Sequence, residues 1–147
     1  MTLHAFTDGA SRGNPGESGI GIIVKDGNND VLFSLNGYIG TTTNNVAEYT
    51  ALLTLLHRAA DISCTHMIVH SDSELMVRQV NGQYKVKDRQ LQRYHRQVKA
   101  AIAELPFSVE LKHIPREQNR DADKLANIGI DTRTEVTLRN PEAIGPH

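Results

Sequence analysis

The spacing of the apolar residues changes once along this chain, near residue 45, and that change restricts the folds that it can adopt. Before it, short segments rich in β-forming residues predict strands at 3–7, 19–25 and 31–39. A glycine-rich stretch at 9–16 is predicted to be the first turn, and Asp-Gly-Asn-Asn-Asp at 26–30 is typical of a hairpin turn. Strands joined by such short loops pair with their neighbours, so this part predicts an antiparallel meander.

After it, the apolar residues follow a helical period that two short strands interrupt. The predicted helices are 46–60, 73–80, 90–105 and 119–130, and the predicted strands are 67–70 and 107–114. The order βββαβααβα predicts an α/β fold with a mixed five-stranded sheet, three strands antiparallel and two parallel, flanked by helices. We expect one domain, residues 1–131, followed by a tail, 132–147, in which no periodicity survives.

The composition of the chain excludes several classes of protein. Its 147 residues, 39% of them hydrophobic and 22% charged, suffice for one domain with a buried core. The single cysteine, Cys64, excludes an internal disulfide and a cysteine-based zinc cluster. No apolar run approaches the roughly 20 residues that span a membrane, and the N-terminus lacks a signal-peptide pattern. We therefore expect a cytoplasmic protein that has no membrane partner.

Four carboxylates stand where predicted elements begin or end. Asp8 follows the first strand, Glu48 and Asp123 lie in the first turns of helices, and Asp72 follows the apolar strand 67–70. Acids at such positions can converge on one edge of a sheet, where they repel one another unless a cation joins them. Hard oxygen ligands suit Mg²⁺ or Mn²⁺. The pattern therefore predicts a divalent-metal site for phosphoryl chemistry.

Each of these acids also has a purely structural explanation. Asn45 with Glu48, and Ser71 with Glu74, are spaced as helix-capping pairs, and an acid such as Asp123 favours a first helical turn. Coincidental caps would not need to fall at all four places together, however. The joint pattern therefore favours a shared site.

A basic run is the second charged feature of the chain. It holds six Lys or Arg residues and His95 against one acid, Asp88, between Lys85 and Lys99. Such a run is either a face that follows phosphates or an ordinary solvated helix face, and both interpretations stay open. The net charge of −1 does not exclude a polyanionic substrate, because metal-binding acids themselves lower it.

These motifs resemble those of type 1 ribonuclease H over residues 3–130. The matching segments are Phe-Thr-Asp-Gly-Ala at 6–10 with Asn-Pro-Gly at 14–16, Thr-Asn-Asn-Val-Ala-Glu at 43–48, Ser-Asp-Ser at 71–73, and Asn119 with Ala-Asp-Lys-Leu-Ala at 122–126. The resemblance implies a monomeric endonuclease that hydrolyses the RNA strand of RNA/DNA hybrids with two Mg²⁺ ions, for which Mn²⁺ can substitute. It implies products with 5′-phosphate and 3′-hydroxyl ends.

The resemblance also implies roles for individual residues. The metal-binding catalytic acids would be Asp8, Glu48, Asp72 and Asp123. The residues that touch the hybrid would be Asn14, Asn44 and Asn45, with Thr43 at a phosphate of the DNA strand.

Two features depart from many members of that family. The loop before the last acid is short, as in a branch where arginine replaces a mobile catalytic histidine, so Arg116 takes that role, with His113 as the alternative. Residues 81–88 leave no room for a basic protrusion, and hybrid binding would then either be modest or rely on Lys85, Lys87 and Arg89. Two other functions are kept open: another nuclease on the same fold, and a nucleic-acid-binding module without catalysis.

Overall fold

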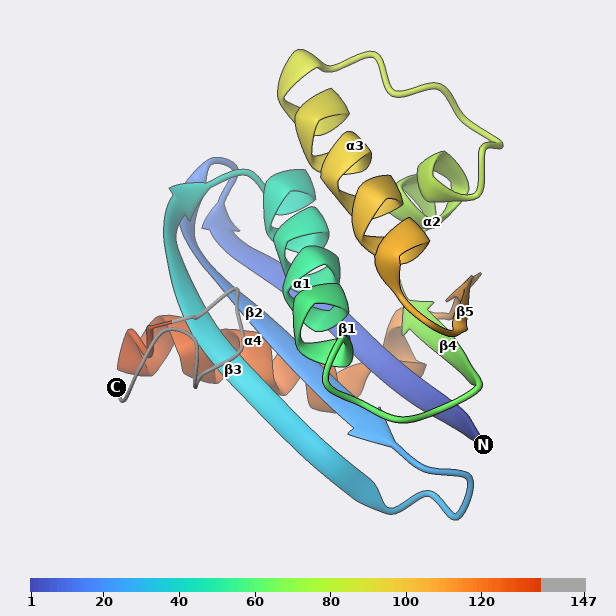
Figure 1. Cartoon of the computed structure of the whole chain (residues 1–147). Coiled ribbons are helices and arrows are strands. Elements are labelled where there is room, and N and C mark those ends of the chain that lie inside the picture. Colours follow the sequence, from blue (N-terminus) through green and yellow to red (C-terminus); the bar gives the residue numbers. More distant parts are fainter. Residues whose placement is uncertain (136–147) are drawn as a thin grey trace.

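The sheet and its helices follow the predicted order in a computed structural model, which describes residues 1–135 (Figure 1). The strands are β1 (Thr2–Gly13), β2 (Gly16–Lys25), β3 (Val31–Thr42), β4 (His66–Ser71) and β5 (Ser108–His113). The helices are α1 (Asn44–Ala59), α2 (Glu74–Val80), α3 (Arg89–Glu104) and α4 (Arg120–Thr132), with a short 3₁₀ turn, Arg116–Gln118, before α4. The predicted α/β class and the order βββαβααβα are confirmed.

The five strands form one mixed sheet in the order β3-β2-β1-β4-β5. The pairs β1–β2 and β2–β3 are antiparallel, whereas β1–β4 and β4–β5 are parallel, as predicted. Helices α1, α2 and α3 lie on one side of the sheet, and α4 crosses the other side over β2, β3 and β1 (Figure 1). The central strand β1 therefore has a helix packed on each of its faces.

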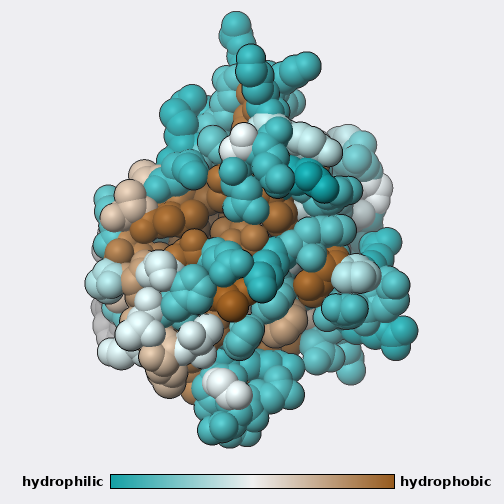
Figure 2. Space-filling view, turned by 90° about the vertical axis from the view of Figure 1, so that its right-hand side faces the viewer, coloured by the Kyte–Doolittle hydropathy of each residue, from teal (hydrophilic) through white to brown (hydrophobic). Residues whose placement is uncertain are grey.

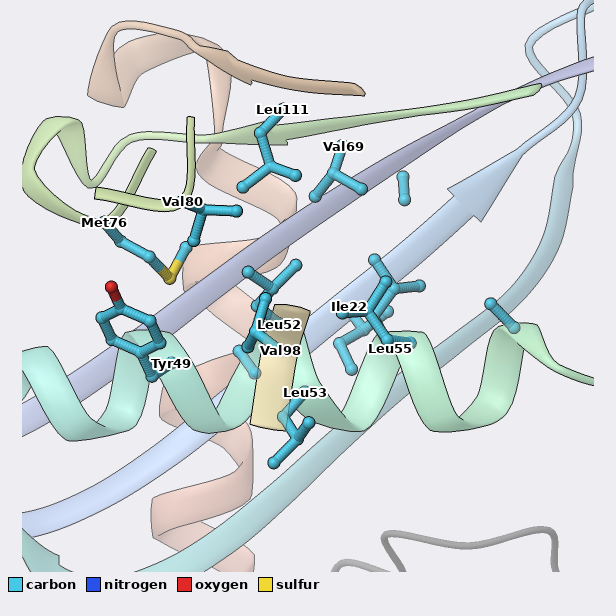
Figure 3. Packing of buried hydrophobic residues seen from close by; sticks show 14 of the residues in the cluster. Ile22, Tyr49, Leu52, Leu53, Leu55, Val69, Met76, Val80, Val98 and Leu111 are labelled. Atoms are coloured by element: carbon cyan, nitrogen blue, oxygen red, sulfur yellow. The ribbon is translucent and has the colours of Figure 1, made fainter. Parts of the chain in front are cut away.

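The core lies between the sheet and α1. Leu52 and Leu55 of α1 face strand residues such as Ile22 and Val69, and Val98 of α3 packs on the same cluster (Figure 3). All five side chains are fully buried. The helical period places the apolar stripe of α1 on the sheet, and burial of this apolar area is the main stabilising contribution.

The first turn differs from the prediction. The glycine-rich stretch 9–13 is strand, because β1 and β2 stay paired until Gly13 meets Gly16, and only Asn14 and Pro15, joined by a cis peptide bond, form the turn. Gly9 serves a close approach instead, since an added Cβ would lie 2.3 Å from the Ala47 carbonyl carbon of α1. Its lack of a side chain, and not its freedom to turn, explains that glycine.

Neither of the capping pairs considered as structural alternatives forms. Helix α1 begins at Asn44, two residues earlier than predicted, and its N-cap is Thr43, whose hydroxyl accepts a hydrogen bond from the Val46 amide at 3.2 Å. The N-cap of α2 is Ser73, whose hydroxyl accepts from the Met76 amide at 3.2 Å. A hydroxyl at each true N-cap satisfies one of the free amides of the first turn, which leaves Glu48 available for another role.

The start of the predicted tail packs against the sheet. Helix α4 ends at Thr132, the Tyr38 amide donates to the Thr134 carbonyl at 2.6 Å, and Arg133 pairs with Glu17 and lies over the Tyr38 ring at 4.8 Å. Residues 136–147 of that tail lie outside the described residues.

The surface is polar where loops extend beyond the sheet. Viewed from the side on which β4, β5 and the N-terminus lie, polar residues cover the upper and lower projections of the molecule, and apolar residues gather near the middle (Figure 2). Of the described helices, none has the length and apolar character needed to cross a membrane.

Candidate metal centre

Three acids from three separate elements meet at one place. Asp8 comes from β1, Glu48 from α1, and Asp72 directly follows β4. One carboxylate oxygen of each lies within 4.8 Å of those of the other two. Asp8 and Glu48 are each only 4% exposed, and Asp72 is half-buried. The predicted convergence of these three acids is confirmed.

The sheet register and one close helix contact bring them together. Parallel pairing sets Thr7 of β1 opposite Ser71 of β4. Asp8 and Asp72 are the next residues along the two chain segments, so they lie beside each other where this pairing ends. Glu48 reaches them because α1 packs directly on the backbone of β1, where the Gly9 amide donates to Glu48 Oε1 at 2.9 Å. This bond engages the Glu48 carboxylate with a backbone amide of β1 instead of an amide at the start of its own helix.

Burial and repulsion raise the pKa values of the two innermost acids. The pKa of Asp8 is raised by burial first, then by the charges of Glu48 and Asp72 and by a hydrogen bond with Asp123. The pKa of Glu48 is raised by burial and then by the charge of Asp72, against the opposing Gly9 hydrogen bond. Asp8 and Glu48 therefore favour their protonated forms more than free carboxyl groups do, and a bound cation would favour the ionised forms.

Asp123 approaches the same cluster from the other face of the sheet. It lies in the first turn of α4, is half-buried, and shares a hydrogen bond with Asp8. Asp8 is thus flanked by acids from both sides. The four predicted acids are brought together, with Asp123 beside Asp8 but outside the tightest group of three.

The residues around the cluster fit a hard divalent cation. Within residues 1–135, no Lys, Arg or His forms an ion pair with any of the four acids. Buried Asn119 donates to the Thr7 carbonyl at 2.9 Å and to Asp72 Oδ2 at 3.5 Å, while its own Oδ1 has no partner among the described residues. Buried oxygen donors without a compensating cation suit Mg²⁺ or Mn²⁺.

Asn119 was present in the sequence motif, but its contact with Asp72 was not predicted. Its position before a helix suggests only a cap, and it makes no such side-chain bond. No sequence signal shows that it faces β1 and β4, because that depends on how the loop after β5 returns to the sheet.

The predicted hybrid-contacting residues gather at the start of α1. Asn14, in the β1–β2 turn, accepts from the Asn44 amide at 3.1 Å, so the turn and the helix start are joined. Asn44 and Asn45 are exposed, and Thr43 is half-buried as the N-cap. This exposed polar group lies one helical turn before Glu48.

Arg116 and His113 are both exposed near the ends of β4 and β5. His113 pairs in register with Ser71, the residue before Asp72, and Arg116 opens the 3₁₀ turn that leads to α4. Both residues therefore lie near the strand ends at which Asp72 follows β4.

The basic run is more than a solvated helix face. His95 and Lys99 of α3 contact the carbonyls of Gln79 and Val80 at 3.2 Å each, at the end of α2. These two residues line a surface hollow of about 340 Å³, together with others that include Lys85, Arg96 and Tyr84. Two members of the run thus stabilise the fold, and the other five are exposed, of which Lys85 and Arg96 line the hollow.

Known proteins resemble this chain in sequence and in fold. A family model described as reverse transcriptase-like matches residues 6–129. Ribonuclease HI from Halobacterium salinarum is 37% identical over 130 residues, which are 88% of this chain. The structure of RNase H1 from that archaeon has a TM-score of 0.85 at 34% identity and covers 90% of this chain and 99% of its own.

A further solved structure is LC11-RNase H1, from compost, in complex with RNA/DNA hybrid. Its TM-score is 0.84 at 40% identity, with 88% of this chain and 97% of that chain covered. This chain spans 64% of the length of the archaeal ribonuclease HI and 36% of a bifunctional protein from Mycobacterium tuberculosis, which is 37% identical over 132 residues.

The family match runs from before Asp8 to beyond Asp123, and so includes all four acids. The order of strands and helices is that expected from the resemblance in sequence. The chain belongs to the type 1 ribonuclease H family.

Proposed function

We propose that this protein is a metal-dependent endonuclease that hydrolyses the RNA strand of RNA/DNA hybrids. The observation that carries the proposal is the cluster of Asp8, Glu48 and Asp72, whose oxygens lie within 4.8 Å of one another with no cationic side chain paired to them in residues 1–135. A binding module for a polyanion would gain from losing these acids, because they repel phosphates. Their retention favours catalysis.

The four acids would hold two Mg²⁺ ions, with Mn²⁺ as a possible substitute. Bound there, the ions would lower the pKa of an attacking water and stabilise the leaving 3′-oxygen, giving 5′-phosphate and 3′-hydroxyl ends. Asp8 would be the central ligand, because its carboxylate lies within 4.8 Å of those of Glu48 and Asp72 and shares a hydrogen bond with Asp123. Asn119 would orient Asp72 through its amide.

Selection of RNA requires contacts with the 2′-hydroxyl group, which DNA lacks. Glu48 accepts the Gly9 amide with Oε1, which leaves Oε2 able to accept from a ribose hydroxyl. Asn14, Asn44 and Asn45 offer polar groups one turn away, and Thr43 would contact a phosphate of the DNA strand. Such contacts position sugar and phosphate, so we expect little dependence on base sequence.

Two further assignments belong to the proposal. Arg116, on its exposed turn, would neutralise charge at the phosphate or help to release the product. Lys85, Lys87 and Arg89 would contact the backbone of the hybrid, and the protein would act as a monomer.

The decisive experiment compares four labelled substrates with and without Mg²⁺: the hybrid labelled on RNA, the hybrid labelled on DNA, double-stranded RNA and double-stranded DNA. We expect cleavage only of the RNA in the hybrid, only with the metal, and products that a ligase joins through their 5′-phosphates. Asp8→Asn should abolish cleavage, whereas Asp121→Asn, at an exposed acid of the same helix turn as Asp123, should not. Binding of the hybrid without turnover would instead identify a non-catalytic module, and cleavage of DNA a different nuclease.

A further inference from the structure

A chain of hydrogen bonds links Asp123 to the protein surface. Asn127, one turn later on α4, donates from Nδ2 to the Asp123 carbonyl at 3.0 Å and to its carboxylate Oδ1 at 3.4 Å. Arg12, on β1 four residues after Asp8, donates to Asn127 Oδ1 at 3.2 Å and to its carbonyl at 3.4 Å. The other guanidinium nitrogen donates to Asp131 Oδ1 at 2.7 Å.

The donors and acceptors in this series of hydrogen bonds can be arranged in only one way. A guanidinium group can only donate hydrogen bonds, and an ionised carboxylate can only accept them. Arg12 therefore determines which end of the Asn127 amide is the oxygen, and this turns Nδ2 toward Asp123. Asp131 in turn holds Arg12, whose side chain is 45% exposed and would otherwise move in solvent.

The same contacts connect two elements that carry acids. Arg12 belongs to β1, which carries Asp8, whereas Asn127 and Asp131 belong to α4, which carries Asp123. Within residues 1–135, Asn127 is the only side chain whose amide donates to the Asp123 carboxylate. The other hydrogen bond of this carboxylate is shared with Asp8, which is itself an acid, so Asn127 provides the neutral donor.

We propose that Asn127 is a positioning residue for Asp123, and that Arg12 and Asp131 hold Asn127 in the required orientation. This rests on the proposed function, in which Asp123 completes the metal centre. A neutral amide suits the task, because a lysine or arginine at this place would pair with Asp123 and compete with a divalent ion. Partners that orient a metal ligand typically change metal affinity or activity about 10–100-fold when they are removed.

The test replaces Asn127 by leucine, which has a similar size but no donor. Mg²⁺ binding is measured by calorimetry with MgCl₂ alone, and hybrid cleavage is measured with the same proteins. We expect the Kd for Mg²⁺ to rise about tenfold or more and kcat to fall by a similar factor, with KM for the hybrid within about twofold of wild type. Asn127→Gln, which keeps the amide, should restore part of the loss, whereas a purely packing role would treat both variants alike.

Arg12→Leu, alone and combined with Asn127→Leu in a double variant, tests the contribution of Arg12. Because Arg12 acts through Asn127, the double variant should lose no more Mg²⁺ affinity than Asn127→Leu alone. Thr132→Val is the matched control: Thr132 is an exposed residue of α4 that takes no part in these hydrogen bonds to Asp123, so the variant should bind Mg²⁺ as wild type does.

The outcomes separate the two proposals. If wild type cuts the hybrid while Asn127→Leu keeps the wild-type Mg²⁺ affinity and kcat, the positioning role is overturned and the nuclease proposal stands. If wild type binds Mg²⁺ but cuts no hybrid, the nuclease proposal fails, and the comparison of Mg²⁺ affinities still decides the role of Asn127. A wild type that binds no Mg²⁺ overturns both. If the losses of Mg²⁺ affinity in the double variant are additive, Arg12 does not act through Asn127.

Discussion

Replacing Asp8 by asparagine should stabilise the metal-free protein while it abolishes cleavage. Asp8 is 4% exposed, and its pKa is raised by burial and by the charges of Glu48 and Asp72. A carboxyl group whose folded-state pKa is raised destabilises the fold as the pH rises above its unfolded value of about 4, until the pH passes the folded value. Asparagine has the shape of the protonated acid and carries no charge, so it avoids this destabilisation at every pH.

The magnitude follows from the distance between neutral pH and the unfolded pKa. One pH unit corresponds to about 1.36 kcal/mol, so a group that stays protonated at pH 7 can destabilise the fold by at most about 4 kcal/mol. Because Glu48 and Asp72 share the repulsion, we expect about 1–3 kcal/mol. For a domain of this size, that free energy corresponds to a rise in Tm of about 3–10 °C.

Thermal unfolding followed by circular dichroism measures the effect, in EDTA and in millimolar MgCl₂, from pH 5 to pH 8. The difference in Tm between Asp8→Asn and wild type should be small at pH 5 and grow toward pH 8 in EDTA. Mg²⁺ should raise the Tm of wild type more than that of the variant, because it binds the ionised cluster. Asp121→Asn is the control for loss of an exposed acid. An Asp8→Asn protein that unfolds at or below the wild-type Tm in EDTA at pH 8 would refute this reasoning.

Three further predictions concern the site and its supports. Glu48→Gln keeps an acceptor for the Gly9 amide, so circular dichroism should show an intact fold while kcat falls by at least about tenfold. Gly21→Ala places a Cβ 2.1 Å from the Ala122 carbonyl oxygen of α4 and should lower the free energy of unfolding by about 2 kcal/mol or more in urea, whereas Gly27→Ala meets nothing within 4 Å and should not. Arg116→Ala should leave Tm unchanged and lower kcat; a loss on His113→Ala alone would transfer the role to that histidine.

The fold was largely predictable because its signals are local. Apolar period distinguishes strand from helix within a few residues, and turn chemistry at 26–30 defines the second hairpin, so the meander and the order of elements were predicted correctly. The same local reasoning failed at 9–13, and at Glu48 it left a cap and a site as alternatives. In the sequence, a glycine that permits a helix to approach cannot be told from a glycine that permits a turn. Likewise, Asn45 and Glu48 have the spacing of a capping pair whether or not the capping hydrogen bond forms.

By itself, the sequence determined which residue types were available and at which element ends they would stand, because polar residues at strand ends and first helical turns are set by nearest neighbours along the chain. Only the tertiary structure decided that Asp8, Glu48 and Asp72 come within 4.8 Å, since this depends on the parallel register of β1 with β4 and on the approach of α1 to Gly9. It also decided that Asn119 and Asn127 contact acids of the site. Hydrogen bonds between segments far apart in the sequence leave no periodic trace in it, so the supports of the site could be found only in three dimensions.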